Sequence, residues 1–163
     1  MARRGWSWLS TGELFRRSTD PEVLGRLATG ELIDDKMTNT VLTEALAGFS
    51  NTRHIVLDGY PRNTAQAQWL LDHMPEHQRS IEAIVVFEVP KEELHKRLFG
   101  RGRSEDDPKV IAHRLDIYAK QTQPVLDFYA AQGVPICKID GHGSVGVVHD
   151  RIHDALTKSS LVR

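Results

Sequence analysis

An acid and an arginine flank a short turn at the end of an apolar run in residues 55–62 (IVLDGYPR). Asp58 follows the apolar residues, and a carboxylate at the end of a buried strand can hold Mg²⁺ directly or through water. The Gly-Tyr-Pro sequence predicts a fixed turn from which Arg62 projects, and a guanidinium on a rigid support suits a phosphate group. A plain β-turn with a surface arginine explains the same residues equally well.

A second group of candidate residues is basic and lies between residues 95 and 114. Three interpretations stay open for it: a solvated helix face, a phosphate clamp, or a nucleic-acid-binding patch. Three consecutive acids at residues 105–107 would repel a nucleic-acid backbone and would suit a lid that moves on ion pairs. The basic residues are His95, Lys96, Arg97, Arg101, Arg103 and Arg114.

The composition excludes several classes of protein. The 163 residues carry 21 Lys and Arg against 22 Asp and Glu, and the net charge of −1 argues against a protein dedicated to coating nucleic acid. Cys137 is the only cysteine, which rules out an intramolecular disulfide and a cysteine-rich zinc site and favours a cytoplasmic location. No apolar run approaches the roughly 18 residues that span a bilayer, so no membrane partner is expected.

Strands and helices alternate in the pattern of apolar residues. The two middle apolar runs are rich in Ile and Val and are typical of strands buried on both faces. The alternation predicts an α/β fold with a mainly parallel sheet covered by helices on both faces. Ligands bind beyond the carboxyl ends of the strands in such sheets. The predicted strands are residues 6–9, 54–57, 84–87 and 134–139.

Helix start signals lie between these runs. The longest helical pattern contains Pro124, which should bend or split it. Small, acidic and turn-forming residues follow each strand, where the fold class expects a ligand. The predicted helix starts are Ser10, Asp20, Asp34, Asn63, Pro90, Asp107 and Ser144.

Six collinear segments together resemble the adenylate kinase family and, more broadly, the nucleoside-monophosphate kinases. Residues 9–16 (LSTGELFR) and 30–35 (GELIDD) are similar to the family segments LSTGDLLR and GELVPD at the monophosphate site. Residues 97–114 resemble the short-lid form, in which GR-x-DD precedes a downstream arginine. The other three segments are residues 58–66 (DGYPRNTAQ, similar to DGFPRTxAQ), 118–129 and 139–145.

The resemblance implies one kinase-like domain of the P-loop NTPase type over residues 1–163. A monophosphate-binding segment is expected at about 11–50 and a short lid at about 98–107. The implied reaction moves the terminal phosphoryl group of ATP to a nucleoside monophosphate, with Mg²⁺ as the cofactor and Asp58 ordering its water shell. We therefore expect a cytoplasmic monomer whose partners are nucleotides, with no nucleic acid and no membrane.

The resemblance also implies roles for individual residues. Arg16 and Arg62 would hold the phosphate of AMP, while Arg97 would lie on the donor side and Gly143 near the donor base. Glu105 and Asp106 would steady the lid arginines, although the family has an aspartate where Glu105 stands. The implied catalytic residues are Arg62, Arg101, Arg103 and Arg114; the AMP-binding residues are Thr11, Gly12, Arg16, Glu31, Leu32, Ile33, Gly59, Arg62, Gln66, Arg103 and Arg114; the ATP-binding residues are Arg97, Arg101 and Gly143.

The expected acceptor follows from two of these positions. Thr11 and Gln66 stand where adenylate kinases contact adenine, whereas similar pyrimidine kinases tend to carry Ala and Asn there. A glutamine amide can offer both a donor and an acceptor to the edge of adenine. AMP is therefore the expected acceptor, and a pyrimidine monophosphate is the alternative.

The opening strand and P-loop of the family, G-x-x-x-x-G-K-[ST], have no counterpart, because none of the 12 glycines is followed by lysine. About 20 residues would precede the match on the family pattern, and their strand would lie between those at 54–57 and 84–87. We therefore expect a gap or a rearrangement in the sheet and weak ATP binding. A truncated reading frame explains this most simply, and a noncatalytic nucleotide-binding module is the alternative.

Overall fold

The structure is a computed structural model that describes residues 6–49, 54–100, 102 and 107–158. Strands and helices alternate along the described chain, as the sequence pattern predicts. Each strand pairs in parallel with one neighbour, β1 with β2 and β3 with β4. The strands are β1 (Ser7–Ser10), β2 (Ile55–Asp58), β3 (Ile84–Glu88) and β4 (Ile136–Asp140).

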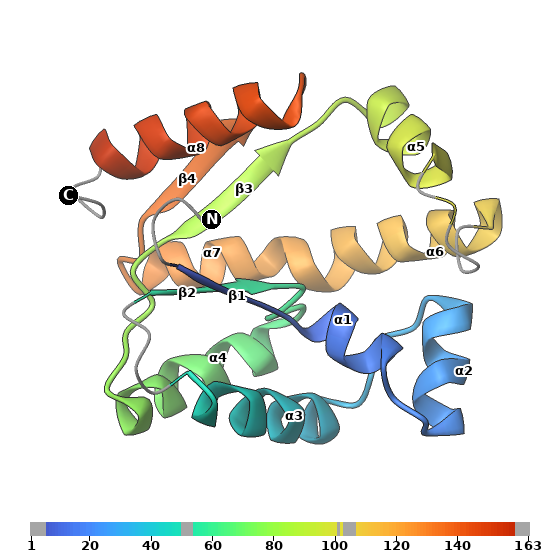
Figure 1. The fold of residues 1–163 in the computed structure, drawn as a ribbon, viewed down its shortest axis with the longest axis horizontal. Helices are drawn as coiled ribbons and strands as arrows, with labels where there is room; N and C mark the ends of the chain where they lie inside the picture. Colours follow the sequence, from blue (N-terminus) through green and yellow to red (C-terminus); the bar gives the residue numbers. More distant parts are fainter. Residues whose placement is uncertain (1–5, 50–53, 101, 103–106, 159–163) are drawn as a thin grey trace.

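These strands form two separate two-stranded sheets in the described part of the chain. The register aligns the carboxyl ends within each pair, so that Ser10 lies opposite Asp58 and Glu88 opposite Asp140. Figure 1 shows β1 and β2 among the N-terminal helices, while β3 and β4 lie beside the last helix. The expected gap between β2 and β3 is confirmed.

The prediction that the two middle strands are buried on both faces is wrong. The first three residues of both β2 and β3 are only partly buried, and Phe87 of β3 is 50% exposed. The physical reason is the division of the sheet. A strand in a two-stranded sheet lacks a neighbour on one edge, and fewer layers cover its faces.

Local capping explains where the helices begin. The side chain of Ser10 accepts from the Glu13 amide at 3.4 Å, and Asp34 accepts from the Met37 amide at 3.1 Å. Such bonds satisfy amides that the first turn leaves without partners. Asp20, Asn63 and Asp107 cap their helices in the same way, which confirms the predicted starts. The first four helices are α1 (Thr11–Arg16), α2 (Pro21–Thr29), α3 (Asp35–Ala47) and α4 (Thr64–His73).

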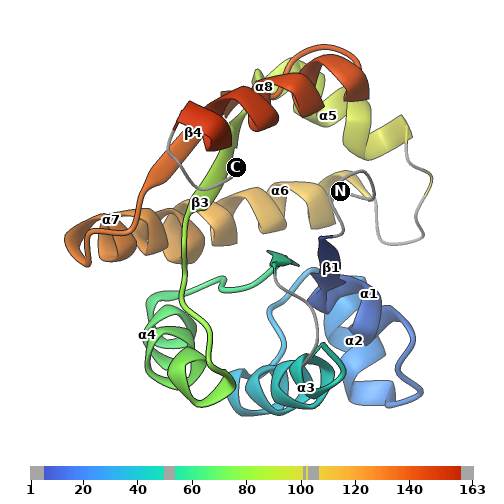
Figure 2. The same cartoon turned by 60° about the vertical axis from the view of Figure 1, so that its left-hand side comes forward.

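The long helical pattern is split before Pro124, as predicted. A π-helical segment, η3 (Tyr118–Thr122), separates α6 (Pro108–Ile117) from α7 (Gln123–Ala131), and Pro124 lies in the first turn of α7. Figure 2 shows α6 and α7 running between the two sheets. The remaining elements are η2 (Met74–His77), α5 (Lys91–Gly100) and α8 (Val145–Lys158).

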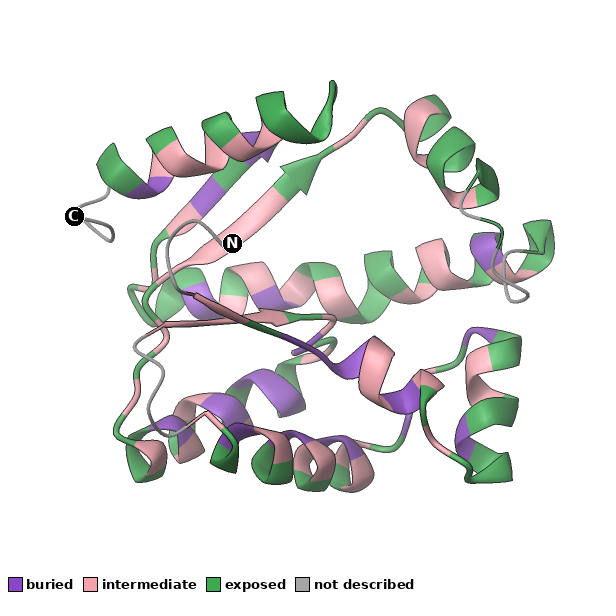
Figure 3. Cartoon of the chain, viewed as in Figure 1, coloured by how far each residue is buried: buried purple, intermediate pink, exposed green. Residues whose placement is uncertain are grey.

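The buried side chains gather around the first sheet. Leu9, Leu42, Tyr60 and Leu70 form one core cluster with Leu46 and Met74. Figure 3 shows buried residues concentrated in α1, α3 and α4, whereas α5 has none and α8 has only Leu156. No described helix is both long and apolar enough to cross a membrane.

Candidate functional site

The turn after β2 lies against the start of α1. The hydroxyl of Thr11 donates to the carbonyl oxygen of Gly59 at 3.0 Å, and Thr11 is only 2% exposed. Gly59 has a φ of +78°, and a Cβ there would stand 3.1 Å from both Thr11 Oγ1 and Arg62 Nη2. The left-handed backbone and the limited space both favour glycine here. The turn brings Thr11, Gly59 and Arg62 together, as the sequence predicts.

Three arginine side chains share this end of the first sheet. Desolvation by the surrounding protein is the largest effect that lowers the pKa of Arg62. The positive charges of Arg114 and, less strongly, Arg16 also lower this pKa, whereas the carboxylate of Asp58 raises it. Arg62 Nε donates to Gly59 O at 2.8 Å, which fixes the guanidinium over the turn. A Cβ at Gly12 would stand 3.3 Å from Arg16 Nη2 and a Cβ at Gly59 would stand 3.1 Å from Arg62 Nη2, so both positive charges lie where α1 meets the turn.

Arg114 reaches this site from α6. Its Nη2 donates to the carbonyl oxygen of Leu27 at 3.0 Å, near the end of α2. Gly30, with a φ of +82°, ends α2, and a Cβ at Gly30 would stand 3.0 Å from side-chain atoms of Arg114 and Val110. The close approach at this glycine brings the two helices together. Arg16, on α1, is held by Glu13 at 2.6 Å.

Gln66 lies behind the turn with its amide in a fixed orientation. Its Oε1 accepts from the backbone amide of Arg62 at 2.8 Å, and its Nε2 donates to Asp35 Oδ1 at 2.7 Å. Asn63 Nδ2 also donates to Asp35 Oδ1, at 3.0 Å. The sequence reasoning missed Asp35. The signal for it in the sequence is the Asp34-Asp35 pair. Asp34 alone caps α3, so the second acid is free to serve another purpose.

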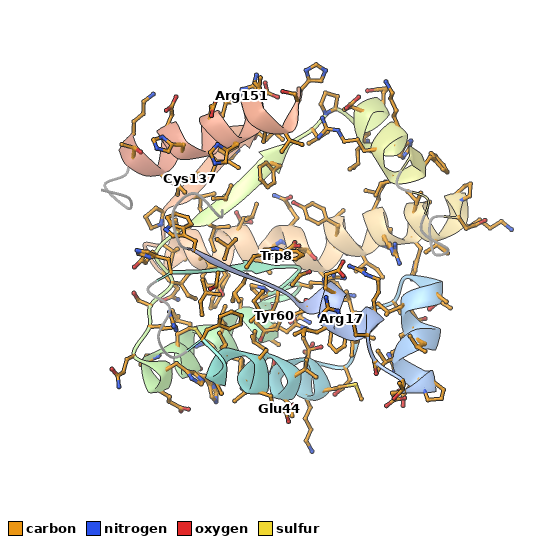
Figure 4. The ribbon with its side chains drawn as sticks, in the orientation of Figure 1. Trp8, Arg17, Glu44, Tyr60, Cys137 and Arg151 are labelled. Atoms are coloured by element: carbon orange, nitrogen blue, oxygen red, sulfur yellow. The ribbon has the colours of Figure 1, made fainter. Side chains whose placement is uncertain are left out.

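Tyr60 supports the same region from within the core. Its hydroxyl lies 2.6 Å from Asn39 Oδ1 and 3.2 Å from the carbonyl oxygen of Gln66. Burial, with smaller effects from Tyr129 and Asp35, raises the pKa of Tyr60. Figure 4 shows Tyr60 in the interior above α3, whereas Glu44 of the same helix points outward. Tyr60 therefore links β2, α3 and α4 beneath the site.

A narrow cavity of about 30 Å³ opens between these elements. Ligand pockets are typically about 300–1,000 Å³, so a nucleotide can enter only if the elements move apart. The structure brings together on this cavity most of the expected AMP-binding residues. Sequence reasoning missed three other lining residues, Phe15, Leu27 and Thr38. The expected residues that line it are Thr11, Gly12, Glu31, Leu32, Ile33, Gly59, Arg62 and Gln66.

A second and larger cavity of about 640 Å³ lies beside α8. Arg97 and Gly143, both expected on the donor side, line it, together with apolar residues of α8 such as Val148 and Ile152. Arg97 Nη1 donates to Gly141 O at 3.0 Å, and its Nη2 donates to Gly143 O at 3.3 Å. The structure thus places both expected residues at one cavity.

Glu93 orients Arg97 from the same helix. Arg97 Nε donates to Glu93 Oε1 at 2.7 Å, and this hydrogen bond is the largest effect that lowers the pKa of Glu93. The sequence reasoning had given no role to Glu93 or to the apolar face of α8. A signal for Glu93 was available in its i, i+4 spacing from Arg97 on a predicted helix.

Four residues to which the expected lid at about 98–107 gives a role fall outside the described part of the chain. They are Arg101, Arg103, Glu105 and Asp106.

Asp58 is the expected partner of the magnesium shell. It is exposed at the end of β2, close enough to Arg62 to raise the pKa of that side chain. Among the described residues, no three His, Cys, Asp or Glu side chains form a group that could hold a metal. Mg²⁺ keeps several waters and uses one or two carboxylates together with substrate phosphates. A single exposed carboxylate fits contact through water.

Comparison with known proteins assigns the family. The model of the family described as adenylate kinase matches residues 1–134. An adenylate kinase of Synechococcus sp. strain WH7803 is 38% identical over 158 residues, covering 93% of this chain and 85% of the relative. The adenylate kinase of Oenococcus oeni is 35% identical over 152 residues, with coverages of 88% and 80%. This chain therefore belongs to the adenylate kinase family.

Proposed function

We infer that the chain transfers the terminal phosphoryl group of ATP to AMP and so forms two molecules of ADP. One observation carries the inference: Arg16 and Arg62 lie against Gly12 and Gly59, two glycines that line the same cavity, and Arg114 is near enough to repel Arg62. They lie beside a cavity lined by Thr11 and Gln66. A nucleoside monophosphate has one anionic end and one base with donors and acceptors, and this arrangement offers a complement to each.

Phosphoryl transfer depends on positioning the two nucleotides and on neutralising the negative charge of the moving group, more than on a reactive side chain. In the transfer, an oxygen of the AMP phosphate bonds to the γ-phosphorus of ATP. The bond from that phosphorus to the bridging oxygen breaks, and its electron pair leaves with ADP. Guanidinium groups aimed at the equatorial oxygens stabilise the charge on the moving group. We assign that role to Arg62 and Arg114, and to Arg101 and Arg103 from the lid.

The donor nucleotide is assigned to the larger cavity. Its volume of about 640 Å³ falls within the usual range for a small-molecule site, and apolar α8 residues line it. Arg97 holds the Gly141–Gly143 backbone that forms one wall. Mg²⁺ would neutralise the donor phosphates, and Asp58 would order its water shell.

A second candidate function is nucleotide binding without turnover. It is a candidate for these 163 residues taken by themselves, because they contain no Gly-Lys pair, the pair that supplies a cation to donor phosphates in P-loop proteins. A pyrimidine-monophosphate kinase is a further alternative. Thr11 and Gln66 support AMP over it, because a threonine and a glutamine line the acceptor cavity.

Two measurements on the 163-residue chain test these alternatives. Calorimetric titrations with AMP, CMP and UMP, and separately with ATP, give the affinity of each site. A coupled assay of ADP formation from ATP and each monophosphate gives the turnover. We expect AMP to bind more tightly than CMP or UMP and to support ADP formation in the presence of Mg²⁺, while ATP binds weakly because these residues contain no Gly-Lys pair.

The other results have distinct meanings. Good turnover of CMP or UMP without turnover of AMP would reject AMP as the acceptor. AMP binding with no turnover would favour the binding module. A chain that binds no monophosphate at all would reject the acceptor site itself.

The proposal includes the remaining expectations of the sequence. A monomeric state, a cytoplasmic location and the absence of nucleic-acid partners remain part of it. Cys137 is the only cysteine of the 163 residues, so no intramolecular disulfide can form, which supports a reducing compartment.

A further inference from the structure

The carboxylate of Asp35 and the amide of Gln66 form a hydrogen-bonded pair at the acceptor cavity. Asp35 stands in the first turn of α3 and Gln66 near the start of α4, 31 residues apart in the sequence. Gln66 lines the cavity, whereas Asp35 contacts it only through Gln66. We propose that Asp35 is a specificity-determining positioning residue, which fixes the amide of Gln66 so that the site accepts adenine and rejects a 6-oxopurine.

The first step concerns the orientation of the amide. A glutamine can turn its amide by 180° and so exchange its oxygen and its nitrogen. In this structure Oε1 accepts from the Arg62 amide at 2.8 Å and Nε2 donates to Asp35 at 2.7 Å. A carboxylate has no hydrogen to donate, so the turned amide would set its oxygen against Asp35. Asp35 thus permits one orientation only.

The second step concerns the hydrogen-bonding positions of the Gln66 amide that remain for a ligand. Its contacts with described residues use one hydrogen of Nε2 and one lone pair of Oε1. One donor and one acceptor remain, in a fixed order. Gln66 is only 2% exposed, so water cannot easily replace a missing partner there.

The third step concerns the base. Adenine presents an amino donor at C6 and an acceptor at N1, while hypoxanthine presents an acceptor at C6 and a donor at N1. An amide of fixed order matches one of these edges, and the turned amide matches the other. A site with buried polar groups rejects the analogue that leaves them unpaired. By fixing the orientation of the Gln66 amide, Asp35 therefore determines whether the site binds adenine or hypoxanthine.

Asn63 strengthens this lock. Its Nδ2 donates to the same Asp35 oxygen at 3.0 Å, and its Oδ1 accepts from the Gln66 backbone amide at 2.8 Å. Asp35 is therefore held in place by the residue that caps α4, and the amide of Gln66 meets a fixed acceptor.

The test compares AMP with inosine monophosphate (IMP), which has the same size and the same phosphate. Calorimetry gives the dissociation constant of each for the wild-type chain, for Asp35→Asn and for Asp34→Asn. Asparagine can also donate at the position of the carboxylate, so it allows the turned Gln66 amide once it gives up the hydrogen bond from Asn63, whereas the carboxylate excludes that orientation. Asp34→Asn removes the same charge one residue away and keeps a good helix cap, because Asp34 bonds to the Met37 amide rather than to Gln66.

We expect the wild-type chain to bind AMP about 100-fold more tightly than IMP, since two hydrogen-bonding groups would be mismatched. In Asp35→Asn this ratio falls by about tenfold, mostly through tighter binding of IMP. The Arg62 amide still favours the native orientation, so part of the preference remains. Asp34→Asn keeps the wild-type ratio. A merely structural role of Asp35 would weaken both ligands together and leave the ratio unchanged.

Several results would overturn the inference. An unchanged ratio in Asp35→Asn, or an equal fall in Asp34→Asn, rejects it, and so does a wild-type chain that binds AMP and IMP alike. Asp35→Ser carries the same expectation, because a hydroxyl also donates and accepts; thermal unfolding of both variants shows whether they fold. If neither folds, Asp35 is structural and the inference falls.

This inference rests on the proposed function, and its failure can be told apart from the failure of that function. A wild-type chain that binds neither AMP nor IMP rejects the proposed acceptor site and the role of Asp35 together. A wild-type chain that prefers AMP, combined with an unchanged ratio in Asp35→Asn, rejects only the role of Asp35.

Discussion

The proposed acceptor side, around Thr11, Arg62 and Gln66, and the proposed donor side, beside α8, differ in volume and in polarity. The acceptor side is a narrow space of about 30 Å³ with polar side chains fixed by short hydrogen bonds, including Thr11 to Gly59 and Gln66 to Asp35. The donor side is a cavity of about 640 Å³ whose wall is largely the apolar face of α8. The first can discriminate by matching hydrogen bonds, whereas the second offers mainly apolar area.

The difference extends to the packing below each side. On the acceptor side α3 and α4 each have three buried residues, two of which, Thr38 and Gln66, line the cavity, while α5 on the donor side has no buried residue. Well-packed elements hold a side chain to a precise position, which directional hydrogen bonds require. The contrast suggests that substitutions on the acceptor side change affinity through geometry, and those on the donor side change it through individual contacts.

The largest expected effect is at Arg62, which lies near the charges of Arg16, Asp58 and Arg114. Arg62→Ala should weaken AMP binding about 100-fold, because a charge-assisted and bidentate contact with phosphate is lost. The free energy of unfolding should change by less than about 1 kcal/mol, since the lost bond to Gly59 is offset by relief of the repulsion from Arg114 and Arg16. Calorimetry with AMP and urea unfolding measure the two quantities.

Arg62→Lys provides the control for charge alone. It keeps the charge without the planar fork, so its AMP affinity should lie between those of the wild type and the alanine variant. An Arg62→Ala variant that loses stability but retains AMP affinity would contradict the assignment.

The next effect tests the donor side. Arg97→Ala should weaken ATP binding about tenfold, because two bonds that hold the Gly141–Gly143 backbone are lost. AMP affinity should stay the same, since Arg97 lies at the other cavity. Lys96→Ala, an exposed neighbour on α5, is the matched control. Equal losses for both nucleotides would show that the two sides are not independent.

A pair of glycines separates backbone strain from site geometry. Gly59 and Gly133 have similar values of φ, +78° and +75°, but a Cβ at Gly133 would meet nothing within 4 Å. Each alanine variant should lose about 1 kcal/mol of stability from the left-handed backbone. Only Gly59→Ala should also lose AMP affinity, by about tenfold, because its Cβ presses on Thr11 and Arg62. Equal AMP affinity in both variants would remove Gly59 from the site.

The smallest effect concerns the tyrosines beneath the two regions. Tyr60→Phe should cost about 1–2 kcal/mol, because it leaves a buried acceptor unpaired, and Tyr129→Phe should cost about 1 kcal/mol. Tyr129 donates to Ala67 O at 3.2 Å, and its burial likewise raises its pKa. Urea unfolding at pH 7 measures the two costs.

These raised pKa values also predict alkaline behaviour. Above the ordinary tyrosine pKa of about 10, the unfolded chain releases these protons while the folded chain retains them. The free energy of unfolding should therefore be constant with respect to these groups below about pH 10 and should fall as the pH rises further. Each Phe variant should fall less steeply. Identical slopes for the wild type and both variants would contradict the assigned pKa directions.

Much of the local structure followed from the sequence, because its signals act over a few residues. Ser10, Asp20, Asp34, Asn63 and Asp107 were predicted helix starts, and each side chain caps a helix. A cap depends only on the next two or three amides. The Asp58 to Arg62 turn was predicted for the same reason.

Burial was harder to foresee, because it depends on elements far away in the sequence. The Ile and Val runs of β2 and β3 predicted strands correctly but predicted their burial wrongly. The composition of a run reports strand propensity, whereas its burial depends on which strands pair beside it. The two separate sheets decide that point.

By itself, the sequence determined the order of the elements and the family resemblance, and it predicted which residues to expect around the acceptor, since each depends on residue types at short spacing. Only the tertiary structure decided which side chains behind those residues hold them. Asp35 and Gln66 lie 31 residues apart, and no local rule joins them. Their contact exists because α3 and α4 pack side by side beneath one sheet, and packing between distant elements depends on the whole chain.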